Sequence, residues 1–275
     1  MSVTLEIEDG NPWYLSPNVW VVPGDDPEGP PGLPIVGINA YLWARVRNTG
    51  NTKVENATVR YYWANPSVGF DRTTANAIGT SFVTLDPGQT GDVLCLTPWT
   101  PVYVNQGHEC ILAEAFHPTA DPLPAVAAFN VPTDRHVAQR NLSVVMASAK
   151  GFHFAFEIHN PGRKEKVFAI NATQGKIESL RKLLPLLGRN FKLPAKQGKV
   201  TRLGFVSAMC PDLEEGGQRS PRIKSLKVKP NGRAGYSLVG TLDGGAALIH
   251  VEQLEQERVV GGLSLLIIHT KEERK

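Results

Sequence analysis

Residues 38–47 read INAYLWARVR, residues 57–64 read ATVRYYWA, and the turn sequence Asn48-Thr49-Gly50-Asn51 follows the first stretch. Apolar side chains recur at every second position in both stretches, which is the period of a strand with one buried face. Asparagine and glycine are residues that tight turns favour. The two stretches therefore predict consecutive antiparallel strands, with Tyr61 and Trp63 of the second strand filling the core.

Further strand-like runs lie on both sides of this pair and are separated by turn residues. Short strands at such spacing favour an antiparallel sandwich over alternating strands and helices. The period changes only near 176–188, where five apolar residues at helical spacing end at Gly188 and predict a short helix. The fold class predicted is all-β, with two tandem immunoglobulin-like antiparallel β-sandwiches, the second carrying that helix. The predicted strands are 3–7, 18–22, 38–47, 57–64, 77–85, 90–96, 110–116, 142–148, 152–159, 166–172, 200–207, 223–228, 236–242, 246–254 and 259–269.

A change in charge divides the 275 residues near position 140. The net charge of +3 hides an acidic first half, with 7 Lys and Arg against 14 Asp and Glu, and a basic second half, with 22 against 12. All five tryptophans lie in the first hundred residues. A compositional step of this kind indicates two units with different surroundings. We therefore expect one domain over residues 1–140 and a second over residues 141–275.

The segment from Ile38 to Phe116 resembles a bacterial immunoglobulin-like family, the cell-adhesion-related domain found in bacteria (CARDB). The motifs that carry the resemblance are the Arg47-Asn48-Thr49-Gly50 phrase, the strand over 57–64, and the turn Leu85-Asp86-Pro87-Gly88-Gln89. The resemblance implies a seven-stranded sandwich that holds or binds, without catalysis. The second half matches only as a generic sandwich.

Few residues form a pattern that could carry chemistry. His108, Cys110, Glu114 and His117 lie close enough in sequence to be weak metal candidates, although their spacing matches no common zinc motif. Cys95 and Cys110 could lie on neighbouring strands, so a disulfide or two reduced thiols are both open. Asp134-Arg135-His136, with Arg140, is expected to make contacts between the two domains. We predict no catalytic residues, no enzyme activity and no cofactor.

The basic excess peaks between Arg163 and Arg233, with 17 positive residues against 5 negative ones. Such a stretch either solvates a surface or meets an acidic partner. We expect a structural or accessory protein that acts through protein–protein contacts and can self-assemble through its acidic and basic halves. The alternative is a module that binds glycans or polyanions, nucleic acid included. The candidate interaction residues are Lys164, Lys166, Arg181, Lys182, Lys224, Lys227 and Lys229.

No apolar run is long enough for a membrane helix, and residues 1–10 lack the layout of a secretory signal. We therefore expect no membrane insertion, and either a cytoplasmic location or export by a non-Sec route.

Overall fold

The computed structural model describes residues 2–64, 69–73, 75–102, 109–126, 128–129, 131–147, 151–194, 196–207 and 219–269. This part of the chain is all-β, apart from short 3-10 helices. It divides into two compact units. Unit 1 comprises Met1–Ala64, Asp71–Asn141 and Lys182–Phe191, and unit 2 comprises Asn65–Phe70, Leu142–Arg181 and Lys192–Lys275.

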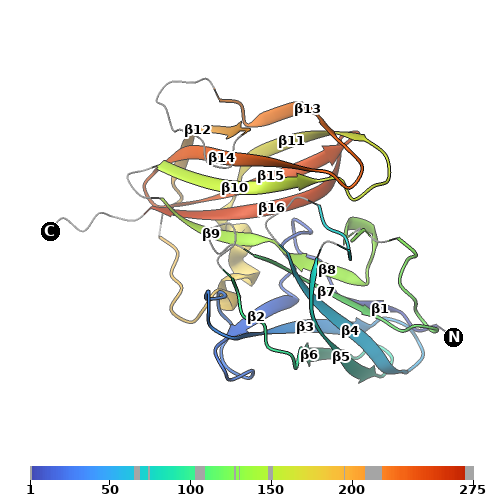
Figure 1. The fold of residues 1–275 in the computed structure, drawn as a ribbon. Helices are drawn as coiled ribbons and strands as arrows, with labels where there is room; N and C mark the ends of the chain where they lie inside the picture. The colour runs from blue at the N-terminus through green and yellow to red at the C-terminus, as the bar shows by residue number, and fades with distance from the viewer. Residues whose placement is uncertain are drawn as a thin grey trace. The chain divides into compact units, whose positions relative to one another are not determined.

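Unit 1 is a sandwich of two antiparallel sheets (Figure 1). In the first sheet β3 is central: β1 and β2 pair with one edge of it, and β6 pairs with the other. The second sheet has the order β5-β4-β7-β8, which is the order of strands C′, C, F and G in immunoglobulin domains. The strands are β1 (Leu5–Glu6), β2 (Val19–Pro23), β3 (Ala40–Asn48), β4 (Val54–Ala64), β5 (Asn76–Leu85), β6 (Thr90–Leu94), β7 (Cys110–Phe116) and β8 (Val137–Arg140).

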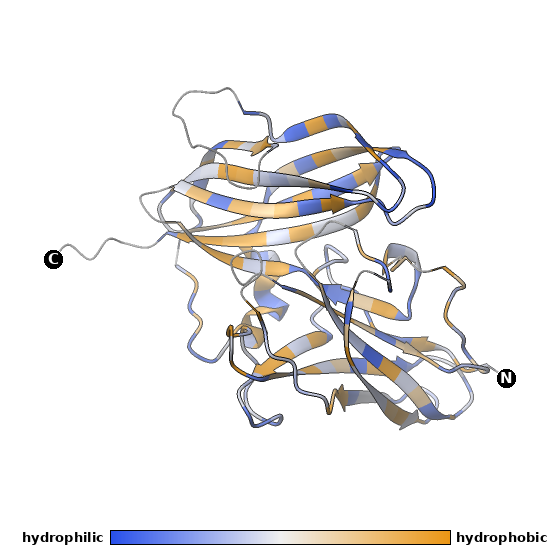
Figure 2. Cartoon of the chain, in the orientation of Figure 1, coloured by the Kyte–Doolittle hydropathy of each residue, from blue (hydrophilic) through white to orange (hydrophobic). Residues whose placement is uncertain are grey.

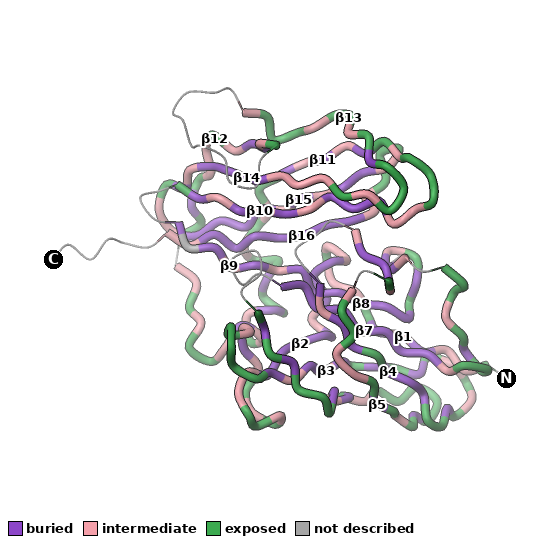
Figure 3. Tube along the Cα trace, in the orientation of Figure 1, coloured by how far each residue is buried: buried purple, intermediate pink, exposed green. Residues whose placement is uncertain are grey.

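The alternation in the sequence explains which face of β3 is buried. Ala40, Leu42, Ala44 and Val46 are fully buried in the core of unit 1, whereas the intervening residues lie toward the outer face. Figures 2 and 3 show this pattern along the strands, with hydrophobic and buried residues alternating with hydrophilic and exposed ones. Burial of aliphatic side chains on one face stabilises the pairing of two sheets by about 1.5–3 kcal/mol for each large residue.

The aromatic residues of β4 differ in burial. Tyr61 is fully buried and its hydroxyl donates to the carbonyl of Val93 at 2.7 Å. Trp63 is half-buried and stacks on Trp99, with 6.4 Å between ring centroids. The strand β8 has no counterpart among the predicted strands, because its four residues are too few to show a period.

Unit 2 is also a sandwich of two sheets (Figure 1). One sheet has the order β10-β14-β12, and the other has the order β13-β11-β15-β16-β9. Every pair is antiparallel except β9 with β16, which is parallel. The strands are β9 (Leu142–Ala147), β10 (Gly151–His159), β11 (Lys166–Gly175), β12 (Lys199–Val206), β13 (Arg222–Val228), β14 (Arg233–Asp243), β15 (Ala246–Glu255) and β16 (Arg258–His269).

The order β13-β11-β15-β16 repeats the order β5-β4-β7-β8 of unit 1. A buried asparagine ends the equivalent strands, Asn48 in unit 1 and Asn160 in unit 2. Each accepts a hydrogen bond from the amide two residues later, Gly50 or Gly162, at 3.1 and 3.0 Å. The two units therefore share the order of these four strands and one corner, although β12 of the other sheet comes between β11 and β13 in unit 2. The resemblance seen in the sequence covered only unit 1.

The segment predicted as a short helix near 176–188 forms two 3-10 helices instead of one α-helix. They are η3 (Ile177–Lys182) and η4 (Leu184–Leu186), and Pro185 lies at the start of η4. Proline has no amide hydrogen and clashes with the preceding turn, which explains why the helix does not continue. A third 3-10 helix, η2 (Val131–Thr133), precedes β8. Within the described residues, no helix has both the length and the hydropathy required to span a bilayer.

Candidate interaction surface

The strand β13 is an edge strand of the five-stranded sheet (Figure 1). It carries three exposed cations. Its partner β11 places Phe168 opposite Leu226 and Ile170 opposite Ile223. The spacing is two residues in β11 but three in β13, so β13 contains a bulge at Lys224 and Ser225. The bulge turns both aliphatic residues toward the core and leaves the polar ones outside. The exposed cations are Arg222, Lys224 and Lys227.

Asn160 joins the loop before β11 to the turn after β13. Its side-chain Nδ2 donates to the carbonyls of Lys164, Val228 and Lys229 at 2.9, 3.0 and 3.1 Å. Its backbone amide donates to the carbonyl of Gly232 at 3.0 Å. One buried amide thus brings two lysine-bearing loops to the same end of unit 2. The sequence showed Asn160 only as part of a turn, because the side-chain hydrogen bonds to Val228 and Lys229 span 68 and 69 residues.

Some cations of this region are already paired. Lys166 Nζ lies 2.8 Å from Glu255 Oε2, and Arg222 lies 3.6 Å from Glu257. By contrast, four exposed lysines form no ion pair with any residue in the described ranges. We call these four the basic edge. They are Lys164, Lys224, Lys227 and Lys229.

The structure separates the other two predicted cations from the basic edge. Arg181 and Lys182 are exposed on η3, which follows the end of β11 at Gly175. The loop that carries Lys164 lies at the other end of β11, before Lys166. Ten residues of strand span about 30 Å, so Arg181 and Lys182 belong to a different region of the surface.

The weak metal candidates have other partners where the structure describes them. Glu114 is fully buried and accepts hydrogen bonds from Tyr62 Oη and Arg72 Nε, both at 2.7 Å. His117 Nδ1 accepts from the amide of Ala120 at 3.0 Å, and Cys110 Sγ contacts the side-chain oxygen of Asn141. His108 lies outside the described residues. Within the described residues no three His, Cys, Asp or Glu side chains are arranged to hold a metal ion.

Cys95 and Cys110 are both buried with free thiols, so the structure contains the reduced alternative. Burial raises the pKa of the Cys95 thiol and outweighs a backbone hydrogen bond with Thr97 that acts in the opposite direction. A buried thiol of raised pKa is a poor nucleophile.

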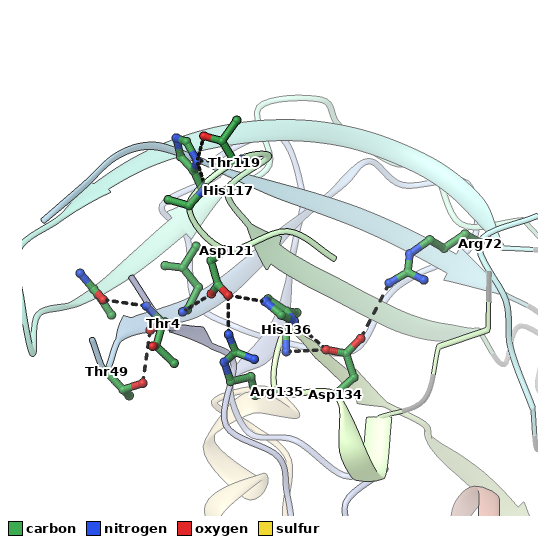
Figure 4. A network of polar contacts seen from close by, with 12 residues as sticks. Thr4, Thr49, Arg72, His117, Thr119, Asp121, Asp134, Arg135 and His136 are labelled. Carbon is green, nitrogen blue, oxygen red and sulfur yellow. Dashed lines mark hydrogen bonds and ion pairs between the residues drawn. The ribbon is translucent and has the colours of Figure 1, made fainter. Parts of the chain in front are cut away.

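A second concentration of charged side chains lies within unit 1 (Figure 4). Asp121 Oδ2 accepts from the amide of Leu5 at 2.7 Å, and its Oδ1 pairs with Arg135 and lies 3.2 Å from His136 Nε2. His136 Nδ1 lies 2.7 Å from Asp134 Oδ1. These contacts fasten the start of β8 to β1, which is a structural role.

Burial acts to raise the pKa of Asp134. Hydrogen bonds from the ring and backbone of His136, with the charges of His136 and Arg72, outweigh burial and lower the pKa overall. The expectation that Asp134, Arg135 and His136 contact the other domain is wrong for the described contacts, because these partners all belong to unit 1. Arg140, on β8, is buried, and burial lowers its pKa to about 10.

Taken with the strand order, these observations define a class: an all-β chain of immunoglobulin-like sandwiches, with a group of exposed lysines at one sheet edge of unit 2. No protein-family model matches the sequence, and no curated protein matches it either.

Several solved structures are similar at low identity. The CupB6 tip adhesin from Pseudomonas aeruginosa is 11% identical with a TM-score of 0.24, over 98% of this chain and 99% of the adhesin. A bacterial adhesin from Mobiluncus mulieris is 7% identical with a TM-score of 0.24, over 92% and 99%. A red sea bream transglutaminase is 12% identical with a TM-score of 0.23, over 93% of this chain but 32% of that protein. At these TM-scores the similarities carry no argument about function.

Proposed function

We propose that this chain is a non-enzymatic structural or accessory protein that acts through protein–protein contacts, with the basic edge as a contact surface. The observation that carries the proposal is that four exposed lysines gather at one edge of unit 2 without an ion-pair partner in the described part of the chain. Unpaired charge of one sign attracts a complementary surface and accelerates its association. A second copy of this chain has acidic residues in its first half that could provide such a surface.

Protection against aggregation is another use of lysine on an edge strand. A lysine there discourages unwanted pairing with strands of other chains. That role suffices for Lys224 and Lys227, which lie on β13 itself. It does not account for Lys164 and Lys229, which lie on loops outside β13. A contact surface accounts for all four lysines.

The resemblance to CARDB domains belongs to the same proposal, and we extend it to both units. Its support is the Asn48 corner, where Nδ2 donates to the carbonyls of Thr52 and Leu85 at 2.9 and 3.3 Å. The Asn160 corner in unit 2 has the same arrangement, with Lys164 and Val228 in the place of Thr52 and Leu85. A shared corner and a shared strand order are what tandem domains of one family would have.

Binding of a polyanion is the second candidate function, and the same four lysines favour it. Glycan binding has less support, because a sugar-stacking platform needs exposed aromatic faces. Trp20 and Trp43, which flank the proline-rich loop, stack on each other with 5.9 Å between ring centroids. Trp20 is buried, and Trp43 is half-buried with Nε1 donating to the carbonyl of Pro27 at 2.9 Å.

Charge reversal on β13 tests the proposal. We expect the wild-type chain to self-associate in sedimentation velocity at low salt and to dissociate as salt screens the charges. The double variant K224E/K227E should weaken association about tenfold or more, which corresponds to a loss of about 1.4 kcal/mol. The variant K176E/R181E makes the same change in net charge on and beside η3 and serves as the matched control.

Binding measurements with duplex DNA and with heparin distinguish protein–protein contact from polyanion binding. Binding of these polyanions by a chain that stays monomeric at low salt would favour the polyanion function over protein contact. If the wild type neither self-associates nor binds either polyanion, or if K176E/R181E weakens association as much as K224E/K227E does, the basic edge is not the contact surface.

A further inference from the structure

We propose that the loop between β2 and β3 in unit 1 is the surface that receives the basic edge of a second copy. This inference rests on the proposed function, since it names the partner of the basic edge. The loop spans residues 24–39 and combines an exposed aliphatic tip with unpaired carboxylates. We call it the acidic loop.

The tip of the acidic loop is a rigid turn rather than a loose segment. The amide of Ile38 donates to the carbonyl of Ile35 at 3.1 Å, which closes a four-residue turn, and Gly37 has the positive φ of 77° that this turn requires. The amide of Gly37 also donates to the carbonyl of Pro101 at 2.9 Å. The backbone therefore holds the aliphatic side chains in a defined position.

Four large aliphatic residues are exposed at this tip. Ile35 is 54% exposed, Val36 41%, Ile38 45%, and Val102, which follows Pro101, 44%. Exposed aliphatic residues that gather on one ordered feature mark an interaction site, whereas single ones are unremarkable. Their burial by a partner would release water from apolar surface and so stabilise a complex.

The charge of the acidic loop identifies the occupant. Asp25, Asp26 and Glu28 are exposed and form no ion pair with any residue that the structure describes. Asp25 is linked to the tip, because Asn39 Nδ2 donates to its carboxylate at 3.1 Å and the amide of Gly24 donates to the carbonyl of Asn39 at 2.7 Å. The carboxylates and the aliphatic residues thus form one surface.

The basic edge offers the complement of both features. Its lysines match the carboxylates in sign, and it also contains an exposed aliphatic residue, since Val167 is 49% exposed and pairs across the ladder with Lys227. One copy carries both surfaces, and the two surfaces differ. The contact therefore joins unlike surfaces, and it can either repeat head-to-tail into rings or filaments or close reciprocally as a two-fold dimer.

Two loop variants test this inference by sedimentation velocity at low salt. D25K/E28K reverses the charge of the loop, and I35S/I38S removes its apolar surface without touching Gly37. We expect each to weaken self-association about tenfold or more. The matched control is E55K/D86K, at the other end of β3, about 27 Å from the acidic loop. This control should associate like the wild type, and circular dichroism should give the wild-type spectrum for every variant.

Mixing provides the sharpest result. D25K/E28K and K224E/K227E should each self-associate about tenfold or more weakly than the wild type, because the first places lysines opposite the basic edge and the second places glutamates opposite the acidic loop. An equimolar mixture should form a complex again, since the acidic loop of the second variant meets the basic edge of the first. Recovery of association in the mixture is expected only if these two surfaces meet.

The outcomes separate the two proposals. If D25K/E28K and I35S/I38S associate like the wild type while K224E/K227E does not, the acidic loop is not the partner surface, but the basic edge remains a contact surface. If E55K/D86K abolishes association instead, the acidic partner surface lies at the far end of unit 1. If K224E/K227E also associates like the wild type, both proposals are overturned.

Discussion

Two asparagines, Asn48 and Asn160, have the same role in the two units. Each is fully buried, and each satisfies backbone groups that would otherwise lack hydrogen bonds where strand and turn meet. A buried amide is tolerated only when its own donors and acceptor are used, which these contacts achieve. Asn160 also holds the two loops that carry Lys164 and Lys229, so in unit 2 the same corner brings these two lysines to one end of the sheet.

A pH dependence of stability follows from Asp9. Burial, followed by the charges of Glu6, Asp134 and Glu8, raises its pKa to about 8. Its Oδ1 is buried and has no hydrogen-bond partner among the described residues. Between about pH 4 and pH 8 the unfolded chain has released this proton while the folded chain retains it. Stability therefore falls as the pH rises through this window.

The variant D9N tests this assignment in urea unfolding at pH 5 and pH 8. We expect D9N to be more stable than the wild type at pH 8 and to show a smaller loss of stability between the two values, because Asn carries no charge at either pH. D86N, which removes an exposed carboxylate, is the control and should retain the wild-type dependence. An unchanged pH dependence in D9N would mean that other groups, such as Glu109 with a pKa raised by burial to about 7, cause it.

The bulge in β13 is the decisive feature at the scale of one element. It reconciles the three-residue spacing of Ile223 and Leu226 with the two-residue spacing of their partners in β11. Without the bulge, one of these aliphatic residues would face solvent, because successive strand residues point to opposite faces. The strand keeps its lysines exposed for the same reason.

Single-residue deletions in β13 test the bulge. Deleting Ser225 should convert the bulge into regular pairing, keep both aliphatic residues buried, and change the free energy of unfolding by less than about 1 kcal/mol. Deleting Lys227 should move Ile223 and Leu226 to the wrong face and destabilise the protein by roughly 2–4 kcal/mol, from the apolar burial lost. Chemical denaturation gives both values, and equal losses in the two deletions would contradict the register described.

At the scale of the whole molecule, each unit has its own hydrophobic core. One core cluster contains only residues of β1–β8 and their connections, and the other only residues of β9–β16. Domains that fold independently each have their own core. Independent folding of residues 1–140 and 141–275 stays a prediction.

Calorimetry of the full chain tests that prediction with the two corner asparagines. We expect two unfolding transitions. N48A should lower the midpoint of one transition and N160A that of the other, each by the equivalent of about 1–3 kcal/mol for the buried groups left unpaired. A single transition that both variants shift equally would show that the chain unfolds as one cooperative unit. Comparing the two variants serves as its own control, because the chemical change is the same.

The sequence by itself determined the strands and the fold class. Alternation of apolar and polar residues is a local signal, and it was strong enough to place the strands of both sandwiches, apart from the short β8. The sequence also located the basic excess. The expectation that the partners of Asp134, Arg135 and His136 lie in the other domain was wrong for the described contacts. A charged residue in a sequence does not reveal which distant group it contacts.

Only the tertiary structure decided which of those charges gather. Lys164 and Lys229 become neighbours through Asn160, and Arg181 and Lys182 are placed elsewhere, because pairing between β11 and β13 brings together segments about 60 residues apart. The tip of the acidic loop is likewise held by a hydrogen bond from the amide of Gly37 to the carbonyl of Pro101. Periodicity reports which face of a strand is buried, but the register between distant strands is a property of the folded chain, and register sets where surface side chains meet.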